Sequence, residues 1–252
     1  MHCAMRAFIL LLSLALCCRA DDVVERIIAH AAAHPAGDAP VSFERAVFDK
    51  DTRHLPIGVF DSGIGGLTVL EALLTLDAFH NDSLQPGADG VPDFARERFI
   101  YFGDQANMPY GNYSAAGRTD YLRELILKDA VFLLGSRWHD GKAARPGKPP
   151  VKAIVIACNT ATAYGLEDIR AAVKAWGLPV IVIGVVEAGA RGVLETGGKT
   201  GAVGVLATVG TCASGVYPRT ITQTLGLAGQ SVPVIAQQGS ATLAGAIEGD
   251  PA

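Results

Sequence analysis

The sequence predicts an α/β fold, specifically a doubly wound parallel sheet. From Ile57 onward a unit repeats in which a short apolar run is followed by a polar or glycine-rich turn and a helical stretch. The runs are almost continuously apolar, which is typical of strands covered on both faces by helices. They read IGVF, RFIYF, KAIVIA, PVIVIGVV, AVGVLA and VPVIA. With 252 residues, 50% of them hydrophobic, the chain can bury one large core or two smaller ones.

The charge of the chain favours small-molecule partners. Charged residues make up 18% of the sequence, and the formal net charge is −4 at pH 7. Lysine and arginine form no cluster along the chain, so the electrostatic footprint of a nucleic-acid-binding protein is missing. We therefore predict no nucleic-acid partner.

Residues 1–20 have the order of a secretory signal peptide. Arg6 precedes an apolar run over residues 7–16, and the small residue Ala20 stands before two aspartates. The run is too short to span a bilayer. We predict cleavage after Ala20 and export to the periplasm or the extracellular space, with no membrane contact afterwards. An uncleaved apolar anchor and a lipid anchor on the adjacent cysteines are the alternatives, and without a functional signal the protein would be cytoplasmic.

After residue 20 we predict a leader segment and two α/β domains. Residues 21–56 form a short helix and a linker, because the apolar residues of DDVVERIIAHAAAH fall on one helical face before PAGDAP breaks the pattern. Residues 57–186 form the first α/β domain, and residues 187–252 form an incomplete second one. Two segments rich in glycine, proline and charge, 80–97 and 136–150, are predicted to be surface loops.

Polar or ionisable side chains follow almost every predicted strand. In a doubly wound sheet, ligands bind beyond the carboxyl ends of the strands. One such residue is an ordinary helix cap, but a set that includes a thiol and carboxylates indicates a site. The residues at these positions are Asp61, Ser62, Gly103, Asp104, Cys158, Asn159, Thr160, Glu187, Thr208, Gln237 and Gln238.

The turn FDSGIGG does not have the spacing of a phosphate cradle. Thr68 stands where a dinucleotide fingerprint needs its third glycine, and no Lys-Ser/Thr pair makes it a P-loop. The turn is better suited to offer backbone and hydroxyl donors to a carboxylate or an amino acid, with Asp61 available for an ammonium group or a proton. The purely structural alternative is a tight turn with Ser62 as a helix cap.

Cys158 ends a predicted buried strand and begins a helix. The amides of the helix N-terminus are expected to lower the pKa of its thiol and so favour a thiolate that acts as a base or a nucleophile. The alternative is a small core residue. Cys212 is the other cysteine that would remain after signal cleavage, and the spacing of the two predicts no disulfide.

The six histidines predict neither a catalytic pair nor a metal site. None follows a strand, whereas a cysteine nucleophile normally has a histidine partner, so a thiolate acting as a base is favoured over a thiol hydrolase. His30 and His34 are four residues apart on a helix, but without a third ligand we interpret them as part of a solvated face.

Five stretches resemble, in order, the motifs of the glutamate racemases, the cofactor-independent aspartate/glutamate racemase family. They are IGVFDSGIGGLTVLEAL, YFGDQANMPYG, AIVIACNTATA, PVIVIGVVEAGA and VGVLATVGTCASGVY. The resemblance implies the first domain of a two-domain racemase-like fold plus part of the second. It also implies an isomerase that interconverts L- and D-glutamate with no cofactor and no metal, for peptidoglycan synthesis. Its partner would be glutamate or a related acidic amino acid such as aspartate, and a homodimer is allowed.

The resemblance assigns roles to individual residues. Cys158 corresponds to the first catalytic cysteine, and Asp61 to a group that helps to manage its proton. Glu187 and Glu248 correspond to supporting carboxylates, with Glu248 the poorer match. The residues at substrate-binding positions are Ser62, Pro109, Tyr110, Gly111, Asn159, Thr160, Thr208 and Thr211.

The resemblance also fails at one point. The GCTHYP-like motif that holds the second catalytic cysteine is nowhere in the chain, and Cys212 does not stand at a matching position. Two hypotheses therefore remain: a glutamate racemase-type enzyme, and an exported, catalytically inactive protein that binds acidic amino acids in the retained pocket. A chain with one matching cysteine is not expected to racemise glutamate at a useful rate.

Overall fold

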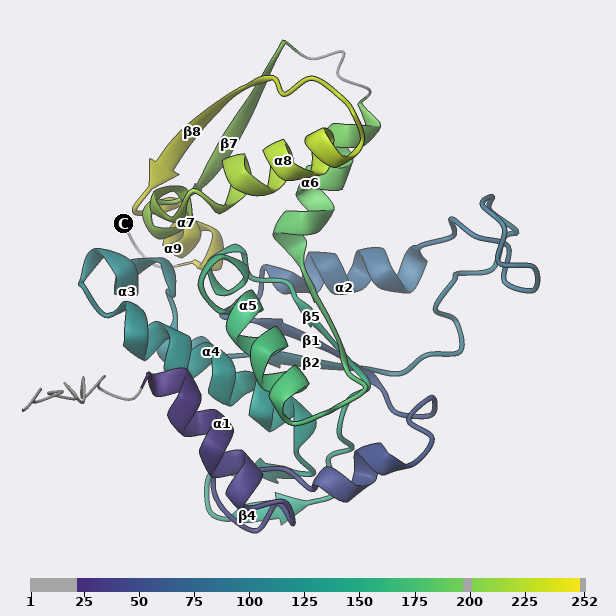
Figure 1. Cartoon of the computed structure of the whole chain (residues 1–252), viewed down its shortest axis with the longest axis vertical. Coiled ribbons are helices and arrows are strands. Elements are labelled where there is room, and N and C mark those ends of the chain that lie inside the picture. The colour runs from purple at the N-terminus through teal and green to yellow at the C-terminus, as the bar shows by residue number, and fades with distance from the viewer. Residues whose placement is uncertain (1–21, 197–200, 250–252) are drawn as a thin grey trace, which may run out of the picture.

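The computed structural model describes residues 22–196 and 201–249. The predicted signal peptide, residues 1–20, lies outside the described residues. In the part that is described, no helix is both long and apolar enough to cross a membrane. Figure 1 shows the largest sheet in the lower half of the molecule and a smaller one at its top, with helices packed around each.

The first sheet has four parallel strands in the order β2-β1-β5-β6. The strands are β1 (Ile57–Asp61), β2 (Phe99–Gly103), β5 (Ala153–Ile156) and β6 (Ile181–Gly184). Asp61 pairs in register with Gly103, and Ile156 with Gly184, so the strands end at one common edge. This sheet, with helices between its strands, confirms the predicted α/β fold.

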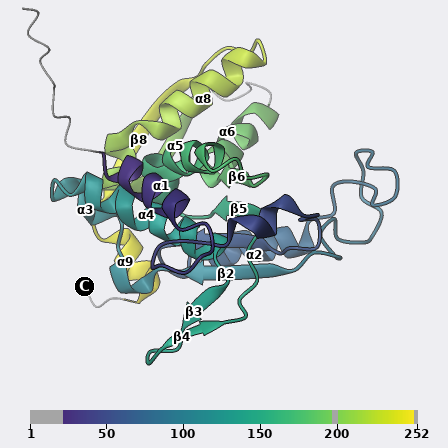
Figure 2. The same ribbon diagram turned by 60° about the horizontal axis from the view of Figure 1, so that its bottom comes forward.

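Helices cover both faces of this sheet to different extents. On one side α4 (Thr119–Leu134) and α5 (Asn159–Ala175) pack against each other, as Figure 2 shows. Gly165 of α5 allows this approach, because a Cβ there would overlap Ile126 of α4. On the other side α2 (Gly66–Thr75) contacts β1 and β2. The fully buried core side chains include Phe60, Leu122, Ile126, Leu133, Ile154, Ile156 and Ile169.

The predicted leader segment packs into the first core. Helix α1 (Val23–Ala33) is capped by Asp22, whose carboxylate accepts from the Val24 amide. Its face of Val23, Val24, Ile27 and Ala31 is buried against α4 and α5. His30 is exposed and His34 is half-buried, and their rings contact each other in a tilted arrangement.

The second sheet has two parallel strands, β7 (Ala202–Thr208) and β8 (Val234–Ser240). Around it lie α6 (Val185–Glu195), α7 (Val209–Ser214), α8 (Val216–Leu227) and α9 (Leu243–Glu248). Its buried cluster contains Ala190, Ile221 and Leu225 among the described residues.

The prediction that all strands are covered on both faces is wrong for three of them. Leu206 of β7 is 63% exposed, and Val234 of β8 is also exposed. Ile181 and Ile183 of β6 are exposed as well. Continuous apolar composition predicts burial on both faces, but these strands have helices packed on one face.

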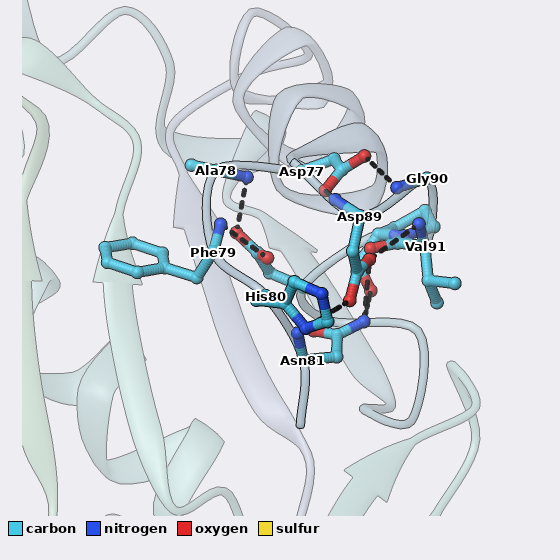
Figure 3. A network of polar contacts seen from close by, with 10 residues as sticks. Asp77, Ala78, Phe79, His80, Asn81, Asp89, Gly90 and Val91 are labelled. Atoms are coloured by element: carbon cyan, nitrogen blue, oxygen red, sulfur yellow. Dashed lines mark hydrogen bonds and ion pairs between the residues drawn. The ribbon is translucent and has the colours of Figure 1, made fainter. Parts of the chain in front are cut away.

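The two predicted surface loops have internal structure. Residues 137–146 form an antiparallel hairpin of β3 (Arg137–His139) and β4 (Ala144–Pro146), so a plain loop was the wrong prediction there. Around residues 77–93, aspartates organise the chain by accepting from backbone amides (Figure 3). Asp77 accepts from the backbone amides of Asp89 and Gly90, and Asp93 accepts from those of Ala78 and Phe79.

A short α-helix, α3 (Gly111–Ala115), precedes α4.

Candidate active site

Cys158 lies at the carboxyl end of β5 and is the N-cap of α5. Its Sγ accepts from the Ala161 amide at 3.4 Å and lies 3.5 Å from the Ser62 hydroxyl. The side chain is buried, with 7% of the residue exposed. The thiol is therefore held between the turns that follow β1 and β5, at the edge where the sequence predicts a site.

A cavity of about 340 Å³ opens beside this thiol, within the range of roughly 300–1,000 Å³ that is typical of small-molecule sites. The structure describes no lysine, arginine or histidine in its wall. Helix α9 contributes Ala244, Gly245 and Ile247. The predicted site residues in the wall are Asp61, Ser62, Pro109, Tyr110, Gly111, Cys158, Asn159, Thr160 and Thr208. A second, more apolar cavity of about 420 Å³ lies between residues 37–44, α4 and the hairpin, and none of these residues lines it.

The pKa of the Cys158 thiol is raised to about 11, mainly by burial and also by the negative charge of Asp61. The hydrogen bonds from Ser62 and from the Ala161 amide act in the opposite direction. The amide of the helix N-terminus thus acts in the predicted direction, but the net pKa is raised, so the predicted thiolate is not favoured. The cost of removing a charge from water is larger than the stabilisation by the helix amide.

Asp61 ends β1 with its carboxylate turned towards α2. One carboxylate oxygen accepts from the Gly66 amide at 2.8 Å, and the residue is buried. Gly66 is required there, because a Cβ would come within 2.8 Å of the Asp61 Cβ. The strand and the turn thus hold a carboxylate rigidly in the wall of the cavity that also contains the thiol.

Tyr110 lines the cavity, but its hydroxyl is engaged elsewhere. The hydroxyl oxygen lies 2.6 Å from a carboxylate oxygen of Asp104 and 2.7 Å from one of Asp129. Burial raises the pKa of this phenol well above its usual value. Of the two carboxylates, Asp104 follows β2 and was identified from its strand end, whereas Asp129 was missed. The signal for Asp129 is a carboxylate on the apolar face of α4, between Ile126 and Leu133.

Three threonines join the two sheets next to the cavity. The Thr160 hydroxyl lies 3.2 Å from that of Thr208 and 3.0 Å from that of Thr211. Thr211 is fully buried, so its hydroxyl serves this junction and does not line the cavity. Nearby, the Tyr217 hydroxyl of α8 donates to the Asn159 side chain at 2.6 Å, a contact between segments distant in sequence.

Two other predicted or considered residues, Glu187 and Cys212, lie outside the described cavity wall. Glu187 lies on α6 and forms two hydrogen bonds of 2.9 Å with the guanidinium of Arg170. Cys212 lies half-buried on α7, outside the cavity wall. Glu248 ends α9, and its side chain lies outside the described part of the structure.

Fold and site together define an α/β protein with a small-molecule cavity at the carboxyl ends of parallel strands, where a buried thiol and a buried carboxylate meet. Comparison with known proteins shows what it resembles. Residues 137–252 match the family described as Asp/Glu/Hydantoin racemase. The chain is also similar to glutamate racemases over about two thirds of its length.

The individual relatives that the chain matches are glutamate racemases. A glutamate racemase from Limosilactobacillus fermentum is 39% identical over 166 residues, which cover 66% of this chain and 47% of that protein. One from Thermus thermophilus is 42% identical over 164 residues, or 65% and 47% of the two chains. The crystal structure of a glutamate racemase isoform from Bacillus anthracis matches with a TM-score of 0.56 and 29% identity over 78% of this chain and 57% of that one. The chain thus spans about half the length of the curated relatives it matches.

Proposed function

We propose that this chain carries a glutamate-racemase-type site in which the Cys158 thiolate removes the α-proton of glutamate. The observation that carries the proposal is the geometry of one cavity, in which a buried thiol, a buried carboxylate and several hydrogen-bond donors meet beyond the strand ends. The relatives named as glutamate racemases support glutamate as the substrate. An isomerase of this type interconverts the L and D enantiomers.

The cavity has the chemistry that removal of an α-proton requires. The proton on Cα is weakly acidic, so the negative charge that develops towards the substrate carboxylate needs fixed donors. Ser62, Asn159 and Thr208 line the cavity and can supply them. A thiol with a pKa of about 11 yields a strong base once it is ionised.

An amino-acid substrate would itself help to ionise the thiol. No cation is described in the cavity wall, while Asp61 places a negative charge beside Cys158. The ammonium group of a bound amino acid would bring a positive charge to this place, and a nearby cation favours the thiolate. The site is therefore better suited to an amino acid than to a simple dicarboxylate.

Complete racemisation also needs a proton donor on the opposite face of the carbanion. Cys158 is the cysteine that the described structure places in the cavity wall. Losing one general acid or base typically slows a reaction by about 10²–10⁴-fold. We expect this chain to exchange the α-proton of one glutamate enantiomer with retention: Cys158 takes the proton, the thiol exchanges with solvent, and the same sulfur returns a deuteron.

Deuterium uptake at Cα tests this proposal. Each glutamate enantiomer is incubated with the 252-residue chain in D₂O, and the α-proton signal is followed by NMR. We expect exchange with one enantiomer, and its loss in Cys158→Ser, because a hydroxyl ionises far less readily than a thiol. Cys212→Ser is the matched control and should exchange normally. Undiminished exchange in Cys158→Ser would remove Cys158 from the mechanism, and rapid racemisation of both enantiomers would require a second base in this chain.

We further propose that a complete racemase-type reaction at this site, with a second acid/base group, would supply D-glutamate for peptidoglycan synthesis, and that the mature chain is exported. The family resemblance supports the first proposal, and the order of residues 1–20 supports the second. Intact-mass analysis of protein from a secreting host tests export. The expected N-terminus is Asp21, and a full-length cytosolic product would contradict it.

A further inference from the structure

A buried cluster behind the cavity contains two carboxylates and one phenol. The Tyr110 hydroxyl oxygen contacts Asp104 at 2.6 Å and Asp129 at 2.7 Å, and all three residues are buried. A phenol has a single proton and can donate it to one carboxylate only. The other contact therefore needs a proton from the carboxyl side, because two unprotonated oxygens would repel each other at this distance. One of the two aspartates must be a neutral acid.

The surroundings of the two aspartates identify the protonated one. Asp104 accepts two further hydrogen bonds from the Asn107 side-chain amide, at 2.9 and 3.0 Å, and donors of this kind stabilise an ionised carboxylate. For the carboxyl group of Asp129 the structure describes no hydrogen bond besides the one to Tyr110. Burial raises the pKa of Asp129 to about 8, with the Asp104 charge adding to the rise.

The basic side chains of α4 are engaged elsewhere and do not neutralise Asp129. Arg123 binds Asp168 and Asp22 at the surface towards α1 and α5, and Lys128 pairs with Glu124. Arg118, the N-cap residue of α4, is exposed to solvent. The ionisable groups that act on the Asp129 carboxyl are Tyr110 and Asp104.

We propose that Asp129 is held as a neutral carboxylic acid that donates to the Tyr110 oxygen, while Tyr110 donates to Asp104. These two hydrogen bonds fix residues 109–111, which form one wall of the cavity. Gly111 in that segment lies against Thr208 so closely that a Cβ would come within 2.8 Å of the threonine Cβ. Asp129 touches no ligand and is a positioning residue. Its effect on catalysis rests on the proposed function, but its protonation does not.

The proton on Asp129 can be detected without any activity. Infrared difference spectra of the full chain should contain the band of a protonated carboxylic acid at neutral pH. The band should disappear as the pH rises through about 8 and should be absent from Asp129→Asn. Asparagine keeps the shape and a donor, so this variant should fold. Absence of the band from the unaltered protein, or its persistence in Asp129→Asn, would overturn the assignment.

The dependence of stability on pH gives a second readout. The pKa of Asp129 in the folded chain is raised from an ordinary value of 3.8 to about 8, so between these values the folded state binds more protons than the unfolded state. The stability of the unaltered protein should therefore fall as the pH rises across this window. In Asp129→Asn this part of the fall should be missing from the denaturant midpoints. Identical pH profiles in the two proteins would contradict the proposal.

Proton exchange at the substrate then tests positioning. Asp129→Leu has a similar volume but no donor, and it should exchange about tenfold more slowly, as expected for the loss of one hydrogen bond. Asp129→Asn should restore exchange. It should also lack the loss of exchange above pH of about 8 that is expected of the unaltered protein. If no variant exchanges but the infrared band is present, the proposed function fails and the protonation stands. Equal exchange in Asp129→Leu and Asp129→Asn would overturn the positioning role.

Discussion

Strands β1 and β7 occupy comparable places in the two sheets but differ in burial. Every residue of β1 is buried, between α4 on one face and α2 on the other. In β7 exposed and half-buried residues alternate, and Leu206 is mostly exposed. The first sheet belongs to a large core that includes the leader helix, whereas the described core of the second consists of three buried residues and the partly buried side chains around them. Packing energy is thus concentrated around the first sheet.

This difference matters for the site because the cavity takes its wall from both regions. The thiol and the carboxylate are placed by β5 and β1, in the densely packed region. Thr208 and the α9 residues belong to the weakly packed region. A reactive group needs a rigid support, whereas a segment that admits a ligand has to move. The distribution of packing agrees with this division of roles.

The largest expected contrast comes from one truncation in each region. Ile154→Ala removes a fully buried side chain from β5 and should lower the free energy of unfolding by about 2–5 kcal/mol. Leu206→Ala removes a mostly exposed side chain from β7 and should change it by less than about 0.5 kcal/mol. Urea unfolding followed by circular dichroism and by the fluorescence of buried Trp176 measures both. A cost of several kcal/mol for Leu206→Ala would mean that the second sheet is covered in solution.

A smaller contrast comes from a methyl group added to one helix in each region. Gly165→Ala on α5 places a Cβ against Ile126, so α4 and α5 must move apart at a cost of about 1–3 kcal/mol. Gly192→Ala on α6 meets no atom within 4 Å and should stabilise the chain by roughly 0.5–1 kcal/mol, because alanine favours a helix. Thermal unfolding of the two variants tests the pair. Effects of opposite sign are expected, and a neutral Gly165→Ala would show that the first core is looser than its packing indicates.

Much of the site could be predicted from the sequence because parallel strands end at a common edge. Asp61, Ser62, Cys158 and Asn159 follow two strands that are neighbours in the sheet, and the structure places them around one cavity. Glu187 follows a strand in the same way but pairs with Arg170 of the preceding helix. A strand-end position therefore predicts where a residue lies but not which partner it finds.

The sequence alone determined the order along the chain of the strands in the two helix-covered sheets and the edge at which polar residues gather, because apolar periodicity and turn residues are local properties of the chain. Tertiary structure decided the rest. The raised pKa of Cys158 depends on how completely other segments exclude water from it. The engagement of the Tyr110 hydroxyl depends on Asp129, a residue of α4. Burial and the choice of hydrogen-bond partner arise from segments that meet only in the folded chain, so no local pattern encodes them.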